Sequence, residues 1–151
     1  MVAMHWGQEY THTPVAEEKE IAKYLASLNV DLVIGTHPHV IQPIEVIDNT
    51  VVVYSLGNFI SAQEYTYQLT GLMATLDVNQ NEIDGLGIDL KLDNLGGELI
   101  YTCRADKCGH YKLYPYSQLT DGILAGYKTH YKTYSSIVKE LNKKVKVVGL
   151  K

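Results

Sequence analysis

Asp31–Val40 reads DLVIGTHPHV, an apolar run that ends in glycine and is followed at once by two histidines. A short and wholly apolar run of this kind is typical of a strand covered on both faces of a sheet. Open α/β sheets bind their ligands at the carboxyl ends of such strands. We therefore expect His37 and His39 to lie at the edge of the sheet where the chemistry takes place.

A second histidine string opens the chain, because residues 5–10 read HWGQEY and follow three residues that suit a strand. Residues 2–5 are expected to be the end of that strand, with His5 at its carboxyl end. A helix is expected between the two strings over Pro14–Leu28, with Thr13 as its N-cap and Pro14 in its first turn. Its apolar stripe is Ile21, Ala22, Leu25 and Leu28.

The pattern of the whole chain predicts an α+β fold, and residues 1–151 are interpreted as a single domain. The expected strands are 31–35, 41–47, 51–55, 72–78, 85–92, 98–104 and 111–115, with turns at 48–50, 79–81, 93–97 and 107–109. A last helix is expected over 121–143, with a break allowed at Gly126. Tyr127, Tyr131 and Tyr134 would form its packing face.

Composition excludes several classes of protein. The net charge of −4 gives no basic face for nucleic acid. No stretch reaches the roughly 20 apolar residues of a membrane span, and the first residues are too short and polar for a signal peptide. Cys103 and Cys108 are five positions apart, which permits a disulfide without requiring one. His110 alone does not turn this pair into a zinc site.

Three histidines are the candidate metal ligands: His5, His37 and His39. Neutral imidazole is the commonest nitrogen ligand for zinc, iron and manganese. In an H-x-H loop the two rings can reach one ion, or each ring can serve a different ion. A ligand role is favoured over a structural one because both strings follow strands. The remaining histidines are interpreted as structural or surface residues: His12, His110 and His130.

Three further residues near these strings are candidates for other roles. Glu9 is a candidate general acid/base or a residue that orients an imidazole, and the alternative is a solvated loop glutamate. Asn58 is a candidate for catalysis or substrate binding, and the alternative is a turn-forming asparagine. Trp6 is a candidate substrate-binding residue, although a place in the core is favoured. The hydroxyls of Thr36 and Ser55 form no recognisable Ser-His-Asp arrangement.

Three motifs in this order and spacing, HWGQEY (5–10), GTHPHV (35–40) and YSLGNF (54–59), resemble the CapA family of poly-γ-glutamate capsule proteins. Gln63 also fits that family, and the resemblance fades beyond about residue 78. The family belongs to the calcineurin-like metallophosphoesterase superfamily. The resemblance implies a four-layer αββα sandwich, of which this chain would be a partial, C-terminal portion that lacks the N-terminal part.

The resemblance also implies roles for the histidines. His5 would be the isolated metal ligand, and His37 and His39 would provide one ring for each of two divalent ions (manganese, iron or zinc) in the complete domain. The carboxylate ligands of the superfamily are expected before His5. Neither Asp31 nor Asp48 lies at a suitable strand end to replace them, so the metal site is expected to be only partly present.

For function, the resemblance implies capsule biosynthesis or export, with a hydrolase-type site that acts on a phosphoester or on an anionic polymer. The alternatives are a non-catalytic polyanion-binding or structural module, or an inactive truncated product. The resemblance also implies an extracytoplasmic, membrane-associated location. A partial sandwich would expose a sheet edge, so we expect an oligomer or association with the missing N-terminal half.

Overall fold

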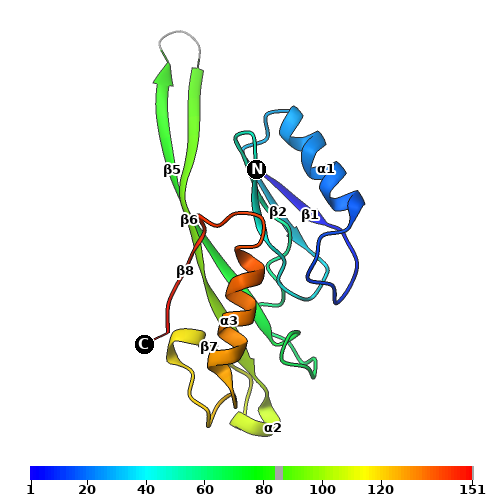
Figure 1. Ribbon diagram of the computed structural model, residues 1–151, viewed down its shortest axis with the longest axis vertical. Helices are drawn as coiled ribbons and strands as arrows, with labels where there is room; N and C mark the ends of the chain where they lie inside the picture. The colour runs from blue at the N-terminus through cyan, green and yellow to red at the C-terminus, as the bar shows by residue number, and fades with distance from the viewer. Residues whose placement is uncertain (84–86, 151) are drawn as a thin grey trace.

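The computed structural model of the protein describes residues 1–83 and 87–150, and it contains two β-sheets and several helices (Figure 1). The α+β class predicted from the sequence is confirmed. Side chains are described except over residues 81–89 and at residue 151. The four-layer sandwich implied by the family resemblance stays a prediction.

The first sheet is mixed, with the strand order β1-β2-β4-β3. Its strands are β1 (Val2–His5), β2 (Leu32–Thr36), β3 (Ile44–Ile47) and β4 (Thr50–Val53). β1, β2 and β4 are parallel, and β3 runs antiparallel to β4. The carboxyl ends of the three parallel strands therefore meet at one edge, where His5 ends β1 and the loops that leave β2 and β4 contain His37 and Asn58.

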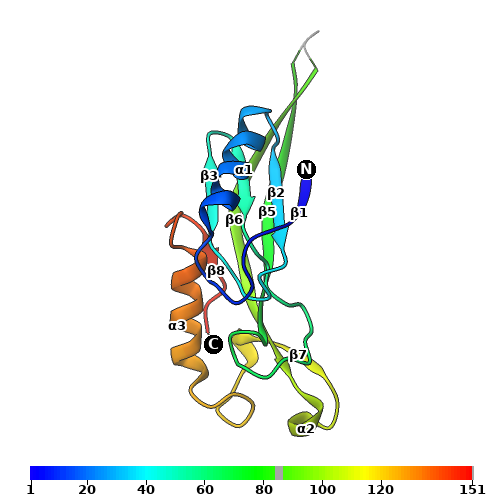
Figure 2. The same cartoon turned by 90° about the vertical axis from the view of Figure 1, so that its right-hand side faces the viewer.

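Successive side chains of β4 point to opposite faces of the sheet, and they pack in the two different hydrophobic clusters of the molecule. Val52 faces helix α1 (Ala16–Ser27) and packs in a cluster with Trp6, Ala22, Val33 and Tyr54. Val51 and Val53 point the other way, into a larger cluster shared with the second sheet and with helix α3 (Tyr127–Val138). Figure 2 shows α1 and α3 covering different parts of the sheets. The first sheet is thus covered on both faces, as the apolar run predicts.

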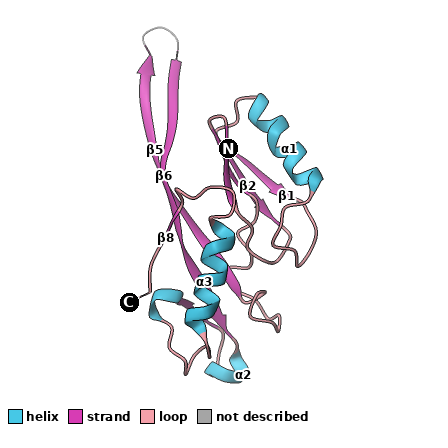
Figure 3. Ribbon diagram, viewed as in Figure 1, coloured by secondary structure: helices cyan, strands magenta, loops and turns pink. Residues whose placement is uncertain are grey.

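The second sheet is built around one long antiparallel ribbon. Strands β5 (Thr70–Ile83) and β6 (Gly87–Cys103) pair along nearly their whole length and extend beyond the first sheet (Figures 1 and 3). β6 also pairs with β7 (Lys112–Pro115) and with β8 (Lys146–Val147). The short helix α2 (Ala105–Cys108) and the 3-10 turn η1 (Tyr116–Gln118) flank β7. A disulfide joins Cys103 to Cys108, with 6.1 Å between the two Cα atoms.

Two turns predicted in the second sheet are wrong. The polar residues 79–81 lie within β5, and residues 93–97 lie within β6. Around residue 79 the ribbon is exposed and polar residues do not end β5, whereas Gly96 and Gly97 are buried in β6 because β8 pairs there. Asn94 has a φ of 51°, and the register shifts between Thr75 and Asp77 opposite it, so the irregularity is absorbed as a bulge. The predicted strand 85–92 is observed from Gly87, and its first residues lie outside the described part.

The helices begin later than predicted. α1 begins at Ala16 with Val15 as N-cap, so the assignment of Thr13 as N-cap was wrong. The Glu18 carboxylate accepts the Val15 N–H at 2.7 Å and does the capping instead. Leu28 is exposed rather than part of the apolar stripe. The last helix spans only Tyr127–Val138, because Gly126, at φ 69°, is its N-cap.

The tyrosine face predicted for the last helix is confirmed. Tyr134 is buried, and Tyr127 and Tyr131 pack against the same cluster.

Among the described residues, no helix combines the length and the apolar character that a membrane span requires.

Gly35 allows the ends of three strands to approach closely. A Cβ atom at this position would lie 1.9 Å from the Tyr54 carbonyl oxygen and 2.3 Å from Trp6 Nε1. With no side chain there, the Trp6 indole donates a hydrogen bond of 2.9 Å to that carbonyl. The glycine between the apolar run and the histidine pair is therefore required by packing.

We expect Gly35→Ala to destabilise the protein by about 3 kcal/mol or more, because β4 or Trp6 must move to admit the methyl group. Urea unfolding at equilibrium measures the change. Gly149→Ala is the matched control, since a Cβ atom there meets nothing within 4 Å. Equal stabilities of the two variants would contradict this account.

Candidate functional site

The three predicted metal-ligand histidines are brought together at the carboxyl edge of the first sheet. His5 ends β1, and its ring centroid lies 4.5 Å from that of His37. The ring of His37 lies 6.1 Å from that of His39. Residues separated by more than thirty positions in the sequence therefore form one row of imidazoles.

Glu9 joins two of these histidines in a potential ligand set. Glu9, His37 and His39 each offer a ligand atom, and the three atoms lie within 4.8 Å of one another. Glu9 Oε1 is 3.8 Å from His39 Nε2. The predicted general acid/base thus lies where it can act as a ligand. His5 is adjacent to this set through His37, outside the three-residue cluster.

The backbone of the site adopts conformations that are rare for residues with side chains. Tyr10, His37 and His39 have φ values of 63°, 99° and 58°. Such residues cluster at functional sites, where the surrounding structure must hold them. A hydrogen bond of 2.8 Å from the Tyr10 N–H to the Pro38 carbonyl joins the two loops. This bond holds Glu9 next to the histidine pair.

Asn58 determines which nitrogen of His39 is free. Its Nδ2 group lies 3.2 Å from the His39 carbonyl, 2.8 Å from Gln63 Oε1 and 2.9 Å from the Gln68 carbonyl. These acceptors orient the amide so that Oδ1 faces His39 Nδ1 at 2.9 Å. Because an amide oxygen can only accept, His39 Nδ1 carries the proton. His39 Nε2, on the Glu9 side, is left with its lone pair free for a metal ion.

Tyr10 and Gln63 complete the surroundings of His39. The Tyr10 ring stacks on His39 with 6.1 Å between centroids, and Gln63 Nε2 donates to the Tyr10 hydroxyl at 3.2 Å. Gln63 therefore contacts both Asn58 and Tyr10. Tyr10 is within a motif that the sequence highlights, but its stacking depends on a left-handed backbone that the motif does not reveal.

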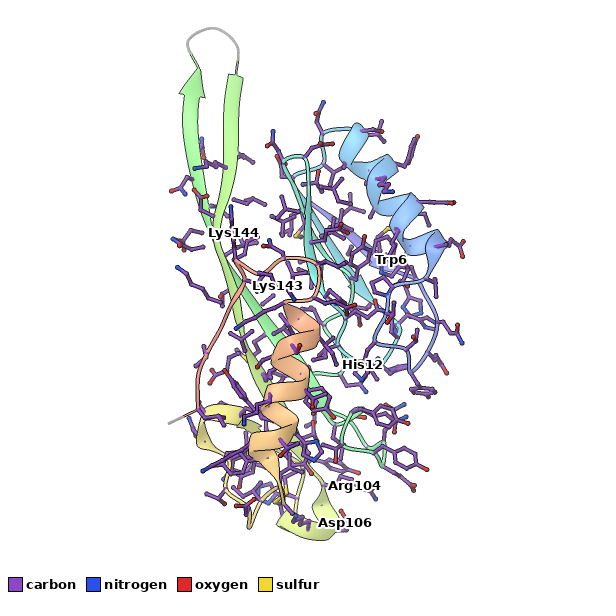
Figure 4. All side chains as sticks on the ribbon, in the orientation of Figure 1. Trp6, His12, Arg104, Asp106, Lys143 and Lys144 are labelled. Atoms are coloured by element: carbon purple, nitrogen blue, oxygen red, sulfur yellow. A yellow bond between two sulfur atoms is a disulfide. The ribbon has the colours of Figure 1, made fainter. Side chains whose placement is uncertain are left out.

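Trp6 and the other histidines lie apart from this arrangement. Trp6 is only 6% exposed and packs between α1 and the first sheet, so the core alternative describes it (Figure 4). His12 Nδ1 lies 2.7 Å from the Ile41 carbonyl, and its ring approaches Tyr134. His130 stacks on Tyr134, and His110 is exposed.

The donor set suits a single divalent ion. Two imidazole nitrogens and one carboxylate oxygen are a common triad for zinc and for iron. Ligands bound at about 2.0–2.2 Å lie at most about 4.4 Å apart, so small side-chain rotations close the set. The side chains of His39 and Glu9 are 39% and 47% exposed, so the site is open to solvent.

A buried carboxylate supports the loop that leaves β1. Glu18 is fully buried, and a Cβ atom at Gly7 would lie 2.5 Å from its carboxyl group. Burial raises the pKa of Glu18, and the hydrogen bond from the Val15 N–H only partly offsets this effect. Burial also raises the pKa of Tyr54, whose hydroxyl donates to Glu45 at 2.7 Å. Neither group belongs to the cluster of Glu9, His37 and His39.

Comparison with known proteins shows which proteins the first part of the chain resembles. Residues 1–63 match the model of the family described as "Bacterial capsule synthesis protein PGA_cap". The chain is 44% identical over 66 residues to the "PGA biosynthesis protein CapA" of Bacillus subtilis (strain 168), which is 44% of this chain and 17% of that protein. It is 38% identical over 66 residues to the "Capsule biosynthesis protein CapA" of Bacillus anthracis, which is 44% of this chain and 16% of that protein.

Residues 1–63 are therefore similar to CapA capsule proteins, as the three motifs predict. The matched segment spans less than a fifth of either relative. It contains every predicted site residue, from His5 to Asn58, and also Gln63.

We expect Glu18→Gln to stabilise the protein increasingly as the pH rises. The folded state holds the Glu18 proton more tightly than the unfolded state, so wild-type stability is lost as the pH rises through the raised pKa. Glutamine keeps an acceptor for Val15 and carries no charge. Urea unfolding between pH 4 and pH 8 measures the difference, with exposed Glu20→Gln as control. A difference that does not vary with pH would contradict the prediction.

Proposed function

We propose that this chain provides part of the metal site of a CapA-type capsule protein, with Glu9, His37 and His39 as ligands of a divalent ion. The observation that carries the proposal is that the ligand atoms of these three residues lie within 4.8 Å of one another. The orientation of Asn58 supports it, because the Nε2 lone pair of His39 is free. His5, beside His37, is available as a fourth ligand or for a second ion.

A bound zinc, manganese or iron ion would polarise a phosphoryl or carbonyl oxygen and would lower the pKa of a bound water molecule. The residues of the chain would then have separate tasks. Glu9 and the two histidines would hold the ion, and Asn58 would keep His39 in its binding tautomer. The exposed side chains leave the ion open to a substrate, which suits a hydrolase-type site for a phosphoester or an anionic polymer.

The ligand set of the described residues is rich in nitrogen and contains one carboxylate. A bridged pair of metal ions needs further carboxylates. We therefore infer that additional ligands come from outside these 151 residues, and that this chain alone has little hydrolytic activity. β1 is an edge strand of the first sheet, and its outer edge is where another strand would add.

The biological role that fits these features is capsule biosynthesis or export at an extracytoplasmic location. The names of the two Bacillus relatives support the capsule role. The net charge of −4 disfavours direct binding of a polyanion by the protein surface. A metal ion at the edge of the sheet would offset this repulsion locally.

We expect the purified chain to bind about one equivalent of Zn²⁺ or Mn²⁺, measured by isothermal titration calorimetry. The double substitution His37→Ala with His39→Ala should weaken binding at least 100-fold, because two of three ligands are lost. Glu9→Gln should weaken it about tenfold, since a neutral oxygen replaces a charged one. His110→Ala is the control, because His110 is exposed and remote in sequence. Unchanged binding in the double variant would refute the assignment.

We also expect the chain to form oligomers, or to require a partner, through the open edge of β1. The unpaired N–H and C=O groups of an exposed edge strand pair readily with another strand. Size-exclusion chromatography with light scattering at micromolar concentration tests this expectation. A stable monomer that also fails to bind any partner segment of a CapA protein would contradict it.

A further inference from the structure

A series of hydrogen bonds connects the metal site to a residue outside the segment that matches the CapA family. Arg104 Nη1 donates to the Gln63 carbonyl at 3.3 Å. Gln63 Oε1 accepts from Asn58 Nδ2 at 2.8 Å, and Asn58 Oδ1 accepts from His39 Nδ1 at 2.9 Å. The guanidinium at the end of β6 is therefore three hydrogen bonds from a predicted metal ligand.

The position of Arg104 is fixed by a small loop closed by the disulfide. Arg104 is the N-cap of α2, and its carbonyl accepts the N–H groups of Lys107 at 3.1 Å and Cys108 at 2.9 Å. The Cys103–Cys108 disulfide ties the end of this turn back to β6. Asp106 forms an ion pair with Arg104, with 3.4 Å between Oδ1 and Nε (both residues are labelled in Figure 4).

The segment that Arg104 contacts is also held by local hydrogen bonds, including those from the Gln63 N–H to Ser61 Oγ at 3.1 Å and from the Tyr65 N–H to Gln68 Oε1 at 3.2 Å. Residues 59–67 contain neither helix nor strand, and Phe59, Ile60 and Tyr65 are exposed. A second connection lies farther along, where the Thr102 N–H donates to the Leu69 carbonyl at 2.8 Å. Arg104, which follows β6, therefore holds the Gln63 carbonyl at a point in the sequence between Asn58 and Leu69.

We propose that Arg104, held by the disulfide-closed loop 103–108, is a positioning residue of the metal site. Arg104 fixes Gln63, and Gln63 in turn fixes the Asn58 amide. The fixed amide keeps the proton of His39 on Nδ1 and leaves Nε2 free for the metal ion. The inference rests on the proposed metal site, but its primary readout, the tautomer of His39, does not need a metal ion.

The tautomer test uses ¹⁵N NMR of the histidine rings in the metal-free chain. Wild type should show His39 protonated on Nδ1. Arg104→Met should shift part of the population to the Nε2–H form, and Arg104→Lys should restore the wild-type spectrum, because lysine also donates. Lys107→Met is the matched control, since it removes an exposed positive charge from the same loop. An unchanged His39 tautomer in Arg104→Met would overturn the inference.

Metal binding provides the second readout. Arg104→Met should weaken Zn²⁺ binding about 3–10-fold, less than the 10–100-fold typical of losing a direct partner of a ligand. Unchanged Zn²⁺ affinity in Arg104→Met, with normal binding by wild type, would overturn the inference and leave the proposed function standing. A wild-type chain that binds no Zn²⁺ would refute the proposed function, and the tautomer test would still decide the role of Arg104.

The role of the disulfide is tested by removing it, alone and in combination with Arg104→Met. Replacing Cys103 and Cys108 by serine should shift the His39 tautomer in the same direction, and the effects of the two changes should not add, because both act through Gln63. Circular dichroism verifies that each variant is folded. Additive effects would overturn the assignment of the disulfide to this series of contacts.

Discussion

The hydrogen bond from the Trp6 indole to the Tyr54 carbonyl is the contact on which the site depends. It joins the residue after β1 to the residue after β4 across Gly35 near the end of β2, so it fixes the ends of all three parallel strands. His5 is the last residue of β1, and the loops that leave β2 and β4 contain His37, His39 and Asn58. A tryptophan in this place is therefore structural, even though it lies next to the candidate ligands in the sequence. Its burial keeps the ligand loops at a constant separation.

Asn58 provides a second constraint, which acts on orientation instead of position. Its amide contacts two carbonyl groups and the side chains of His39 and Gln63. Since the nitrogen side is fully used, the amide cannot rotate without losing several hydrogen bonds. The tautomer of His39 is thus a consequence of the local fold. The same hydrogen bonds would hold His39 ready for a metal ion if the proposed site is correct.

The sequence predicted the first sheet well because its signals are local. An apolar run, a glycine and a turn at Asp48 are sufficient to place β2 and the β3–β4 hairpin. The N-cap of α1 was missed because the buried carboxylate of Glu18 competes with the usual Thr-Pro signal. The turns predicted in β5 and β6 failed because polar residues can also belong to an exposed part of a ribbon, and glycines to a closely packed part. At Gly96 and Gly97 the small residue is needed for close approach to Lys146 and Met73.

The sequence predicted which side chains gather at the candidate site but not the contacts that support them, and a physical reason separates the two. A metal ion requires imidazole or carboxylate groups, so ligand positions are restricted to a few residue types that a motif can reveal. A backbone carbonyl such as that of Gln63 accepts from any donor of sufficient reach, so position 104 is constrained in geometry more than in identity. A matched segment can therefore end near residue 63 while the structure that holds its site continues into the second sheet.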